Sequence, residues 1–433
     1  MAYTYDITTS KKDNKANACL FSCHTISEIV NLFVSTFLVA YIYNFCNGLL
    51  DYVYKVAIYN IVTYLFFQVI YVLAAKIVDS TNRVWVYRVG LLLRAGLVIV
   101  AIFCGQNIAQ MLILAGFLNG ASDAFYYASY NVLKQEMVSR KSMNNFAVIV
   151  QVLTKVVEIV VPVVMGALIE VSTYAQVSIY VLVICTVQIG LSFGIKAKKP
   201  AGSNFSIRKY ISKLKQNPQT HKKMKSLYVL CFVYGFASIV NVLMNVCIMD
   251  QFGSSFSLGA LTSIFAVASI VVILIINKFT KAGKRGIMLY AFSTLPIITS
   301  VLFSVMPNVT TLIIFSLTSV VCRIVYQTIF DIHRNSTLKE AGLYNEINEH
   351  QTIVEWLLNT SRVLSYVVLL VLGIANNLIA FRIVFVVFMI GYSATFIAIA
   401  LYEKKYCKYE TNKPKTLETE LKSDIIENTE NIN

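Results

Sequence analysis

Charged residues are scarce in this chain. Asp, Glu, Lys and Arg make up 14% of the 433 residues, whereas 57% are hydrophobic, and the mean hydropathy is +0.67. A soluble domain has about a quarter of its residues charged. The apolar residues here gather in runs of roughly 20, the length that crosses about 30 Å of hydrocarbon. The sequence therefore predicts an all-α polytopic membrane protein.

The sequence also lacks the motifs of several other classes of protein. It has no GxxxxGK[ST] loop, which argues against transport driven by ATP hydrolysis in this chain. It also has no HExxH motif and no GxSxG motif, which are typical of hydrolases. All four histidines lie in loops or at the ends of apolar runs. His333 with Asp331 is the one candidate for an enzyme centre. We therefore predict that the chain is not an enzyme and needs no cofactor or metal.

Two further absences concern processing and disulfides. Residues 1–19 are polar and contain no apolar core before a small-residue site, so the first apolar run would act as an uncleaved insertion signal. The nine cysteines are scattered, which predicts small buried side chains and argues against a disulfide framework. Cys19 and Cys23, the one close pair, stand one residue too far apart for haem attachment.

Twelve apolar runs predict twelve transmembrane helices in two groups of six. Their predicted bounds are 26–47, 57–75, 84–105, 108–133, 145–169, 173–195, 226–249, 258–277, 286–306, 309–333, 350–373 and 377–401. The predicted regions are therefore a cytoplasmic N-terminal segment 1–25, a first half 26–195, a linker 196–225, a second half 226–401 and a disordered cytoplasmic tail 402–433.

The positive charges predict the orientation of these helices. With the N-terminus in the cytoplasm, the inside segments hold thirty Lys and Arg residues and the outside loops hold Lys55 alone. Positive charge accumulates on the cytoplasmic side, so both termini are predicted to be cytoplasmic, in the cell membrane. This distribution explains the net charge of +15, and no nucleic-acid partner is expected.

The linker 196–225 holds ten Lys and Arg residues and no acid. Its stretch ISKLKQ (211–216) could form a short amphipathic helix on anionic headgroups, which would make membrane lipids a partner. A solvated linker that simply obeys the orientation rule is the alternative.

The two predicted halves share sequence features, as expected of internal repeats. Tyr127 in the fourth run aligns with Tyr326 in the tenth. Gly166 in the fifth run aligns with Gly373 in the eleventh. The second register places Lys155 opposite Arg362, so two cations occupy equivalent depths.

Two short polar loops stand at matching positions, after the second and the eighth runs. AAKIVDSTNRVW (74–85) contains an acid and a cation, Asp79 and Arg83. NKFTKAGKRGIM (277–288) has Thr280 in the place of the acid and then a glycine and a basic cluster. That cluster consists of Lys281, Lys284 and Arg285.

Six-plus-six runs, a basic central linker and this pair of loops resemble the major facilitator superfamily. Its signature loop reads Gly-x-x-x-Asp-Arg/Lys-x-Gly-Arg/Lys-Arg/Lys, and the two loops together recover most of that pattern. The stretch TIVEWLLNTSRVLSYVVLLVLG (352–373) is similar to the eleventh helix of uncharacterised bacterial permeases of this superfamily.

The resemblance implies two halves that rock around a midplane site. It implies that Asp79 with Arg83 latches the cytoplasmic side, against the start of the eleventh helix, and that the second loop forms a weaker latch. It also implies that the first, fourth, seventh and tenth helices line a central cavity. The polar candidates on these helices are Asn44, Tyr126, Tyr127, Asn131, Tyr234 and Asn241.

Charged residues inside the apolar runs are the candidate working residues, because a charge in hydrocarbon costs about 2.5–3.5 kcal/mol. Lys155 and Glu158 are three residues apart and could form either a static pair or a proton-coupling site. Asp123 and Arg323 could pair across the two halves, or each could pair within its own half.

Two further arginines lie in the apolar runs. Arg362 could hold an anionic group of a substrate or clamp Glu355. Arg94 is expected to be structural. The apolar runs hold four cations and three acids, and this balance favours an anionic or zwitterionic substrate.

Together these features predict a monomeric secondary active transporter that moves a small organic solute by alternating access. Protons are the expected coupling ion, through Glu158 or Asp123. Pro162 and Gly166 loosely match an exporter motif of the superfamily and favour export. A receptor or scaffold of the same fold and a lipid flippase remain the alternative functions.

Overall fold

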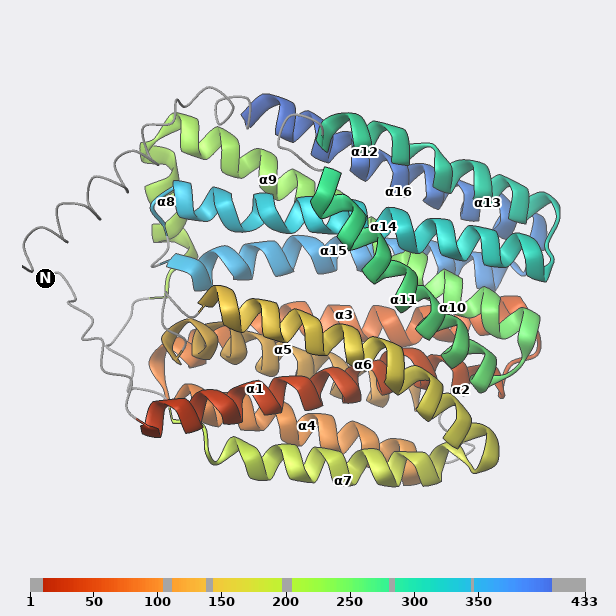
Figure 1. The fold of residues 1–433 in the computed structure, drawn as a ribbon, viewed down its shortest axis with the longest axis horizontal. Helices are drawn as coiled ribbons and strands as arrows, with labels where there is room; N and C mark the ends of the chain where they lie inside the picture. The colour runs from red at the N-terminus through yellow and green to blue at the C-terminus, as the bar shows by residue number, and fades with distance from the viewer. Residues whose placement is uncertain are drawn as a thin grey trace, which may run out of the picture.

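The computed structural model describes residues 11–103, 111–137, 143–196, 205–279, 285–343 and 346–406. All regular secondary structure in these ranges is helical, and most helices run along the long axis of the molecule (Figure 1). The predicted tail lies outside the described residues from position 407 onward, whereas residues 402–406 continue the last helix.

The first half contains six membrane-crossing units. The first unit is continuous and consists of α1 (Lys11–Leu32), a π-helical segment (Phe33–Leu38) and α2 (Val39–Tyr43). The others are α3 (Leu49–Ser80), α4 (Arg83–Phe103), α5 (Leu112–Met137), α6 (Met143–Val171) and α7 (Tyr174–Ser192).

The second half repeats this pattern after a short linker helix, α8 (Ile207–Gln216). Its units are α9 (Pro218–Ala237) with α10 (Ile239–Phe252), α11 (Ser255–Phe279), α12 (Arg285–Ser293) with α13 (Leu295–Val305), α14 (Val309–Glu340), α15 (Ile347–Ala375) and α16 (Leu378–Tyr406).

These units confirm the prediction of twelve transmembrane helices. Eleven stretches of the described chain are long and apolar enough to cross a membrane. The remaining unit is α5, which is less apolar because it carries Asn119, Asp123 and three tyrosines. The fourth crossing helix therefore carries polar side chains between its ends, and it contributes to the candidate site.

The first helix begins earlier than predicted, at Lys11 instead of residue 26. Leu20 and Cys23 are fully buried, and the Cys23 thiol lies 3.5 Å from the carbonyl oxygen of Gln188 on α7. Tertiary packing therefore extends the helix into a segment whose composition predicts a separate N-terminal region.

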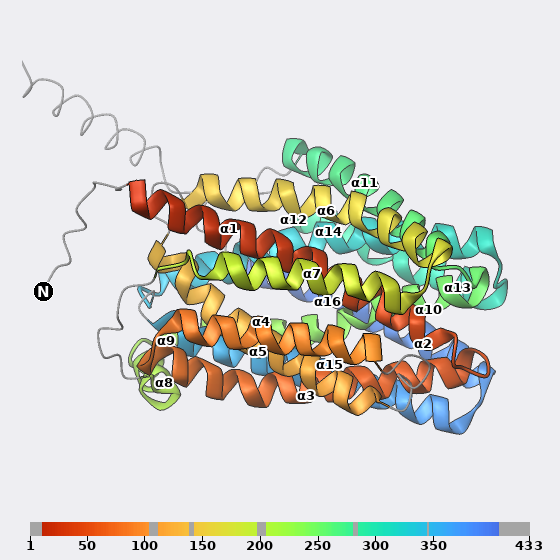
Figure 2. The ribbon, with the colours of Figure 1, turned by 90° about the horizontal axis from the view of Figure 1, so that it is seen from below.

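Helices α1–α7 form one group and α9–α16 the other (Figure 1). The groups meet mainly along two pairs of helices, α3 with α15 and α6 with α11, and α10 also contacts α2 and α3. Seen from below, α3 and α15 lie on one side of the molecule and α6 and α11 on the opposite side (Figure 2). These two contacts position every charged residue of the candidate site relative to the other half.

The glycines aligned by the repeat occupy equivalent places in these two contacts. A Cβ on Gly166 of α6 would lie 2.7 Å from the carbonyl oxygen of Ser255 at the start of α11. A Cβ on Gly373 of α15 would lie 2.6 Å from the Cβ of Tyr54 near the start of α3. Both glycines therefore allow the halves to touch at the end opposite α8.

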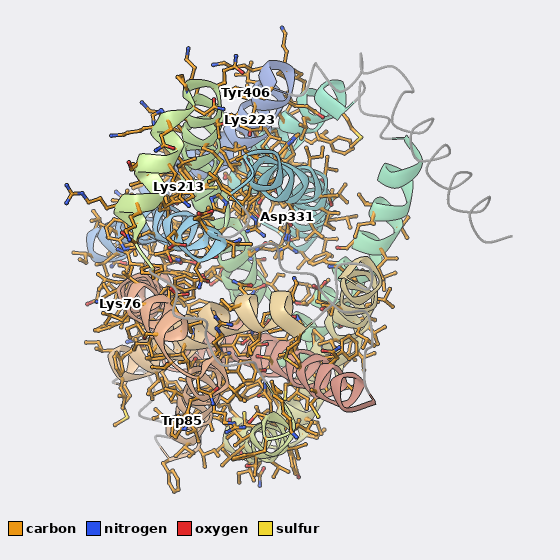
Figure 3. The ribbon with its side chains drawn as sticks, turned by 90° about the vertical axis from the view of Figure 1, so that its left-hand side faces the viewer. Lys76, Trp85, Lys213, Lys223, Asp331 and Tyr406 are labelled. Carbon is orange, nitrogen blue, oxygen red and sulfur yellow. The ribbon has the colours of Figure 1, made fainter. Side chains whose placement is uncertain are left out.

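Helix α8 lies across one end of the bundle (Figure 1). Lys76, Lys213 and Lys223 are visible at this end when it faces the viewer (Figure 3). We call it the basic end. The cap of α4 also lies here: Asn82 Oδ1 accepts a hydrogen bond from the N–H of Val84 at 3.1 Å. Asn82 therefore caps this helix, and neither Asp79 nor Ser80 does.

Candidate functional site

An ion pair lies near the middle of the first half. Arg94 of α4 donates through Nη2 to Asp123 of α5 and through Nη1 to Asn31 of α1. Its Nε donates to Ser122 Oγ at 3.0 Å. The guanidinium thus ties three helices together, and only 7% of the Arg94 side chain is exposed, against 22% for Asp123.

A second pair lies on α6. Lys155 Nζ is 2.5 Å from Glu158 Oε2, and about 30% of each side chain is exposed. The predicted pairing of these residues is confirmed, and their role stays a prediction. Glu28 of α1 lies within electrostatic range of both pairs. This first-half cluster therefore holds three carboxylates against two cations, an excess of one negative charge.

The second half centres on Arg362 of α15. Its Nη1 donates to Asn359 Oδ1 at 3.0 Å, and its guanidinium lies 5.0 Å from the centre of the Tyr64 ring on α3. Asn359 Nδ2 in turn lies 3.4 Å from Glu355 Oε2. Asn359 thus links the arginine to the carboxylate, which is an indirect form of the predicted clamp. The Nε of Arg362 is buried and has no hydrogen-bond partner within the part of the chain that the structure describes.

Two arginines of α14 complete the second-half cluster around Arg362 of α15. Arg334 forms a 3.3 Å ion pair with Asp331. Arg323, this pair and Arg362 all lie within electrostatic range of Tyr234. The second-half cluster therefore holds three cations against two acids, with Glu355 as the second acid. The formal charges of the two clusters have opposite signs and equal size.

The two clusters lie within electrostatic range of one another. Asp123 interacts across the interface with Arg362 and Glu355. The predicted cross-half ion pair of Asp123 with Arg323 is wrong in this conformation, because Arg94 of the same half binds the carboxylate directly. Across the interface, the Asp123 carboxylate interacts with the guanidinium of Arg362.

Two of the tyrosines predicted for the cavity belong to different environments. Tyr127 joins the first-half cluster, since its hydroxyl lies 3.3 Å from Asn31 Nδ2. Tyr126 is 2% exposed and packs in the core of its half, where its hydroxyl lies 2.9 Å from His24 Nδ1 and its ring stacks on Tyr130. Packing therefore accounts for Tyr126.

The other predicted cavity residues are dispersed. Tyr234 stacks on Phe330, with ring centres 4.2 Å apart, and lies within electrostatic range of Arg362. Asn131 of α5 contacts the buried Tyr71 of α3, and Asn241 is half-buried on α10. Asn44 is exposed at the end of α2, thirteen residues beyond Asn31 and so about 20 Å from the cluster. Asn44 is therefore not a midplane residue.

The first predicted latch lies at the basic end. The Asp79 carboxylate lies against the backbone N–H of Phe205 and the side-chain amide of Asn348, in the first turn of α15. Arg83 donates through Nε to the carbonyl oxygen of Val78 at 3.4 Å. Asp79 is therefore next to the start of the eleventh crossing helix, as predicted.

The second predicted latch cannot be placed in the same way. Lys281 and Lys284 lie outside the described residues, and only the backbone of Arg285 is described.

Both residues of the candidate enzyme centre have other neighbours in the structure. Asp331 is bound to Arg334, and the His333 ring packs against Tyr402, with ring centres 5.4 Å apart. Among the described residues, no three His, Cys, Asp or Glu side chains gather as a metal site.

One side of the first-half cluster was not predicted from the sequence. Glu28 and Asn31 of α1 belong to this side. With His24, these residues follow the spacing i, i+4, i+7, which places a polar stripe on one face of an apolar helix. This stripe is the signal that identifies the face of α1 that points into the bundle.

Comparisons with known proteins support the fold that this arrangement suggests. The chain is 22% identical over 287 residues to the uncharacterized protein YqgE of Bacillus subtilis (strain 168), a match that covers 64% of this chain and 65% of that protein. The match thus spans just under two thirds of the relative.

Three solved structures of transporters have a similar fold. A bacterial homologue of the iron transporter ferroportin in the inward-facing state is 11% identical and has a TM-score of 0.65, covering 92% of this chain and 99% of that one. The nucleoside transporter NupG is 13% identical, with a TM-score of 0.65 and coverages of 89% and 99%. A POT family transporter in complex with 5-aminolevulinic acid is 12% identical, with a TM-score of 0.64 and coverages of 89% and 94%.

The family model named Major Facilitator Superfamily matches residues 19–342, which is most of the chain. Its span includes the ion pairs of the first half, the linker helix and the arginines of α14. The twelve crossing helices, the two charged halves and these matches agree, and the chain therefore belongs to the major facilitator superfamily of membrane transporters.

Proposed function

We propose that this chain is a proton-coupled transporter that moves a small organic solute with an anionic group across the cytoplasmic membrane. The supporting observation is the opposite charge of the two facing clusters: one carboxylate in excess in the first half and one cation in excess in the second. Intramembrane ionisable groups are costly and mark ion and substrate pathways.

The excess carboxylate supplies a place for the proton. Glu28, Asp123 and Glu158 share two cations, so one of the three can hold a proton without leaving a cation unpaired. Lys155 and Arg94 then exchange partners as the proton arrives or leaves. Proton binding in the first half thereby changes the charge that faces Arg362 across the interface.

The excess cation supplies a place for the solute. Arg362 has a buried Nε donor that no described residue satisfies, beside two tyrosine rings and an amide. Arginine binds carboxylate and phosphate groups through paired donors. We therefore assign the anionic group of the solute to Arg362, with Tyr64 and Tyr234 beside it.

Export is the direction that we propose, with the protein acting as a monomer. The proposed direction of transport rests on the motif match of Pro162 and Gly166. In the structure these residues contact the start of α11, where the Pro162 carbonyl approaches Gly259. Comparing flux in inside-out and right-side-out vesicles tests this direction separately from coupling.

The assignment of the coupling and solute sites is tested in proteoliposomes. Flux of each member of a library of organic anions is measured under a pH gradient. Glu158→Gln and Asp123→Asn should each remove the pH-driven component of flux. Glu170→Gln is the matched control, because Glu170 lies exposed on α6 outside the cluster. If both variants kept gradient-driven flux, the coupling assignment would fail. Solute binding without flux would instead favour a receptor.

A further inference from the structure

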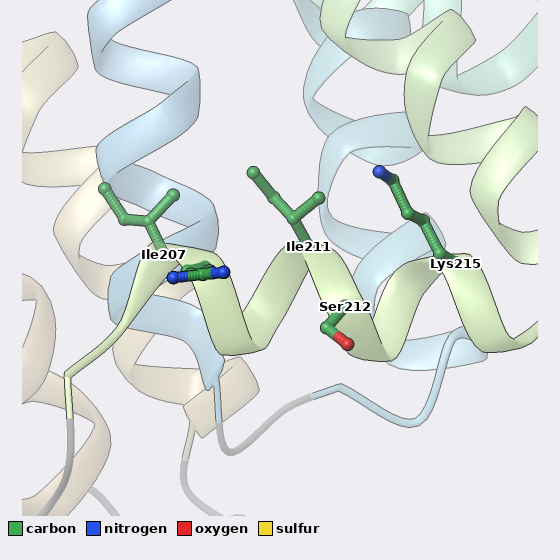
Figure 4. A pocket seen from close by; sticks show the side chains of 5 residues that line it. Ile207, Ile211, Ser212 and Lys215 are labelled. Carbon is green, nitrogen blue, oxygen red and sulfur yellow. The ribbon is translucent and has the colours of Figure 1, made fainter.

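Helix α8 has two faces with different chemistry. Tyr210 and Leu214 are buried against the bundle. Ile207, Ile211 and Lys215 recur every four residues on one side of the helix (Figure 4). With Arg208 and Ser212 they line a surface hollow of about 430 Å³. The hollow combines two isoleucines, two cations and a hydroxyl.

The inner face of α8 packs against the second half at the basic end. The Tyr210 hydroxyl lies 2.7 Å from that of Tyr228 on α9 and 3.3 Å from His350 Nδ1 on α15. Burial raises the pKa of Tyr210 to about 12, so its hydroxyl keeps its proton and can donate. Lys213 pairs with Glu346 just before α15. The helix is therefore firmly attached to the second half.

The residues just before α8 reach the first half. Phe205 packs against the core of that half, and its N–H faces Asp79 of α3. The next residue, Ser206, donates its N–H to Glu349 Oε1 of α15 at 3.1 Å. A force on α8 would thus be transmitted to the contact between the two halves.

The outer face matches the surface of an anionic membrane. The linker 196–225 carries ten basic residues and no acid, and α8 lies in the plane across the ends of the membrane-crossing helices. Amphipathic basic helices lie in the interface with apolar side chains inserted among acyl chains and cations at the headgroups.

We propose that the outer face of α8 is a binding site for an anionic phospholipid of the inner leaflet. Arg208, Ser212 and Lys215 hold its phosphate region, and Ile207 and Ile211 contact the acyl chains next to the headgroup. Because α8 is attached to the second half and Phe205 just before it contacts the first half, the bound lipid favours the conformation in which Asp79 contacts the start of α15.

Binding is measured with the full chain in neutral detergent, titrated with dioctanoyl phosphatidylglycerol. Dioctanoyl phosphatidylcholine and inorganic phosphate are the comparison ligands. The variant Arg208→Gln/Lys215→Gln should weaken binding of the anionic lipid about 25-fold, since each basic residue near an anionic surface contributes about a five-fold factor. The charge-retaining variant Arg208→Lys/Lys215→Arg should bind within about two-fold of the original chain, and it shows that the face tolerates substitution.

The matched control is Lys209→Gln/Lys225→Gln. It removes the same charge from exposed positions of α8 and α9 that do not line the hollow, and it should change the affinity by less than about two-fold. An equal loss in both double variants would show a diffuse field and overturn the site. Equal affinity for the two lipids would also overturn it, as would equally tight binding of inorganic phosphate.

Discussion

At the scale of single residues, the arginine expected to be structural determines how the first-half cluster is built. Arg94 of α4 binds Asn31 of α1 and both Ser122 and Asp123 of α5. A carboxylate at this depth would be costly without that partner. The pair therefore fixes the position of a proposed proton site and also holds α1, α4 and α5 together.

The pair predicts a strongly non-additive mutational cycle. Arg94→Leu leaves a buried carboxylate unpaired and should cost about 3–5 kcal/mol of stability, whereas Arg94→Leu/Asp123→Leu should recover most of that loss. Stability is measured by thermal unfolding of the purified protein in detergent. Additive losses in the double variant would show that the two side chains do not interact.

Side-chain exposure separates the two ion pairs of the first half. Lys155 and Glu158 are each about 30% exposed, whereas Arg94 is 7% exposed. A partly exposed pair depends less on the surrounding packing than a buried one. We therefore expect Glu158→Gln to lower pH-driven flux with a loss of stability below about 1 kcal/mol, in contrast to Arg94→Leu.

At the scale of helices, two glycines allow the halves to close at the end opposite α8. Gly166 and Gly373 stand at equivalent positions of the repeat, and each faces the start of a helix of the other half. Helices approach this closely only where small residues let the backbones meet.

Gly373→Leu should hold α15 away from α3 and favour conformations open at that end. Spin labels at Asn47 and Asn377 should then be farther apart on average than in the original chain, as measured by pulsed electron paramagnetic resonance. Gly391→Leu on α16 is the control, because a Cβ there meets no atom within 4 Å. An unchanged distance distribution in Gly373→Leu would contradict this role of the α3–α15 contact.

At the scale of the whole molecule, the lysines at the basic end predict its orientation. Gln216 on α8 and Asn47 in the loop after α2 are exposed at opposite ends of the bundle. In a background without the native cysteines, an impermeant maleimide should label Asn47→Cys in intact cells and Gln216→Cys only after permeabilisation. Labelling of Gln216→Cys from outside would reverse the orientation.

The sequence alone was sufficient for the architecture. The number of helices, the relation between the halves and the family resemblance follow from apolar runs of membrane length and from repeated positions such as Gly166 and Gly373. These properties depend on local composition and on periodicity, which a chain carries without folding. The Lys155–Glu158 pair was predictable for the same reason, because residues three apart on a helix are always neighbours.

The tertiary structure alone decided which distant charges meet. Asp123 binds Arg94 because α4 and α5 are packed side by side, and a spacing of twenty-nine residues does not indicate that contact. The early start of α1, the cap at Asn82 and the attachment of α8 to both halves likewise depend on neighbours remote in the sequence. Composition determined that this chain crosses the membrane, and helix packing determined where its buried charges lie.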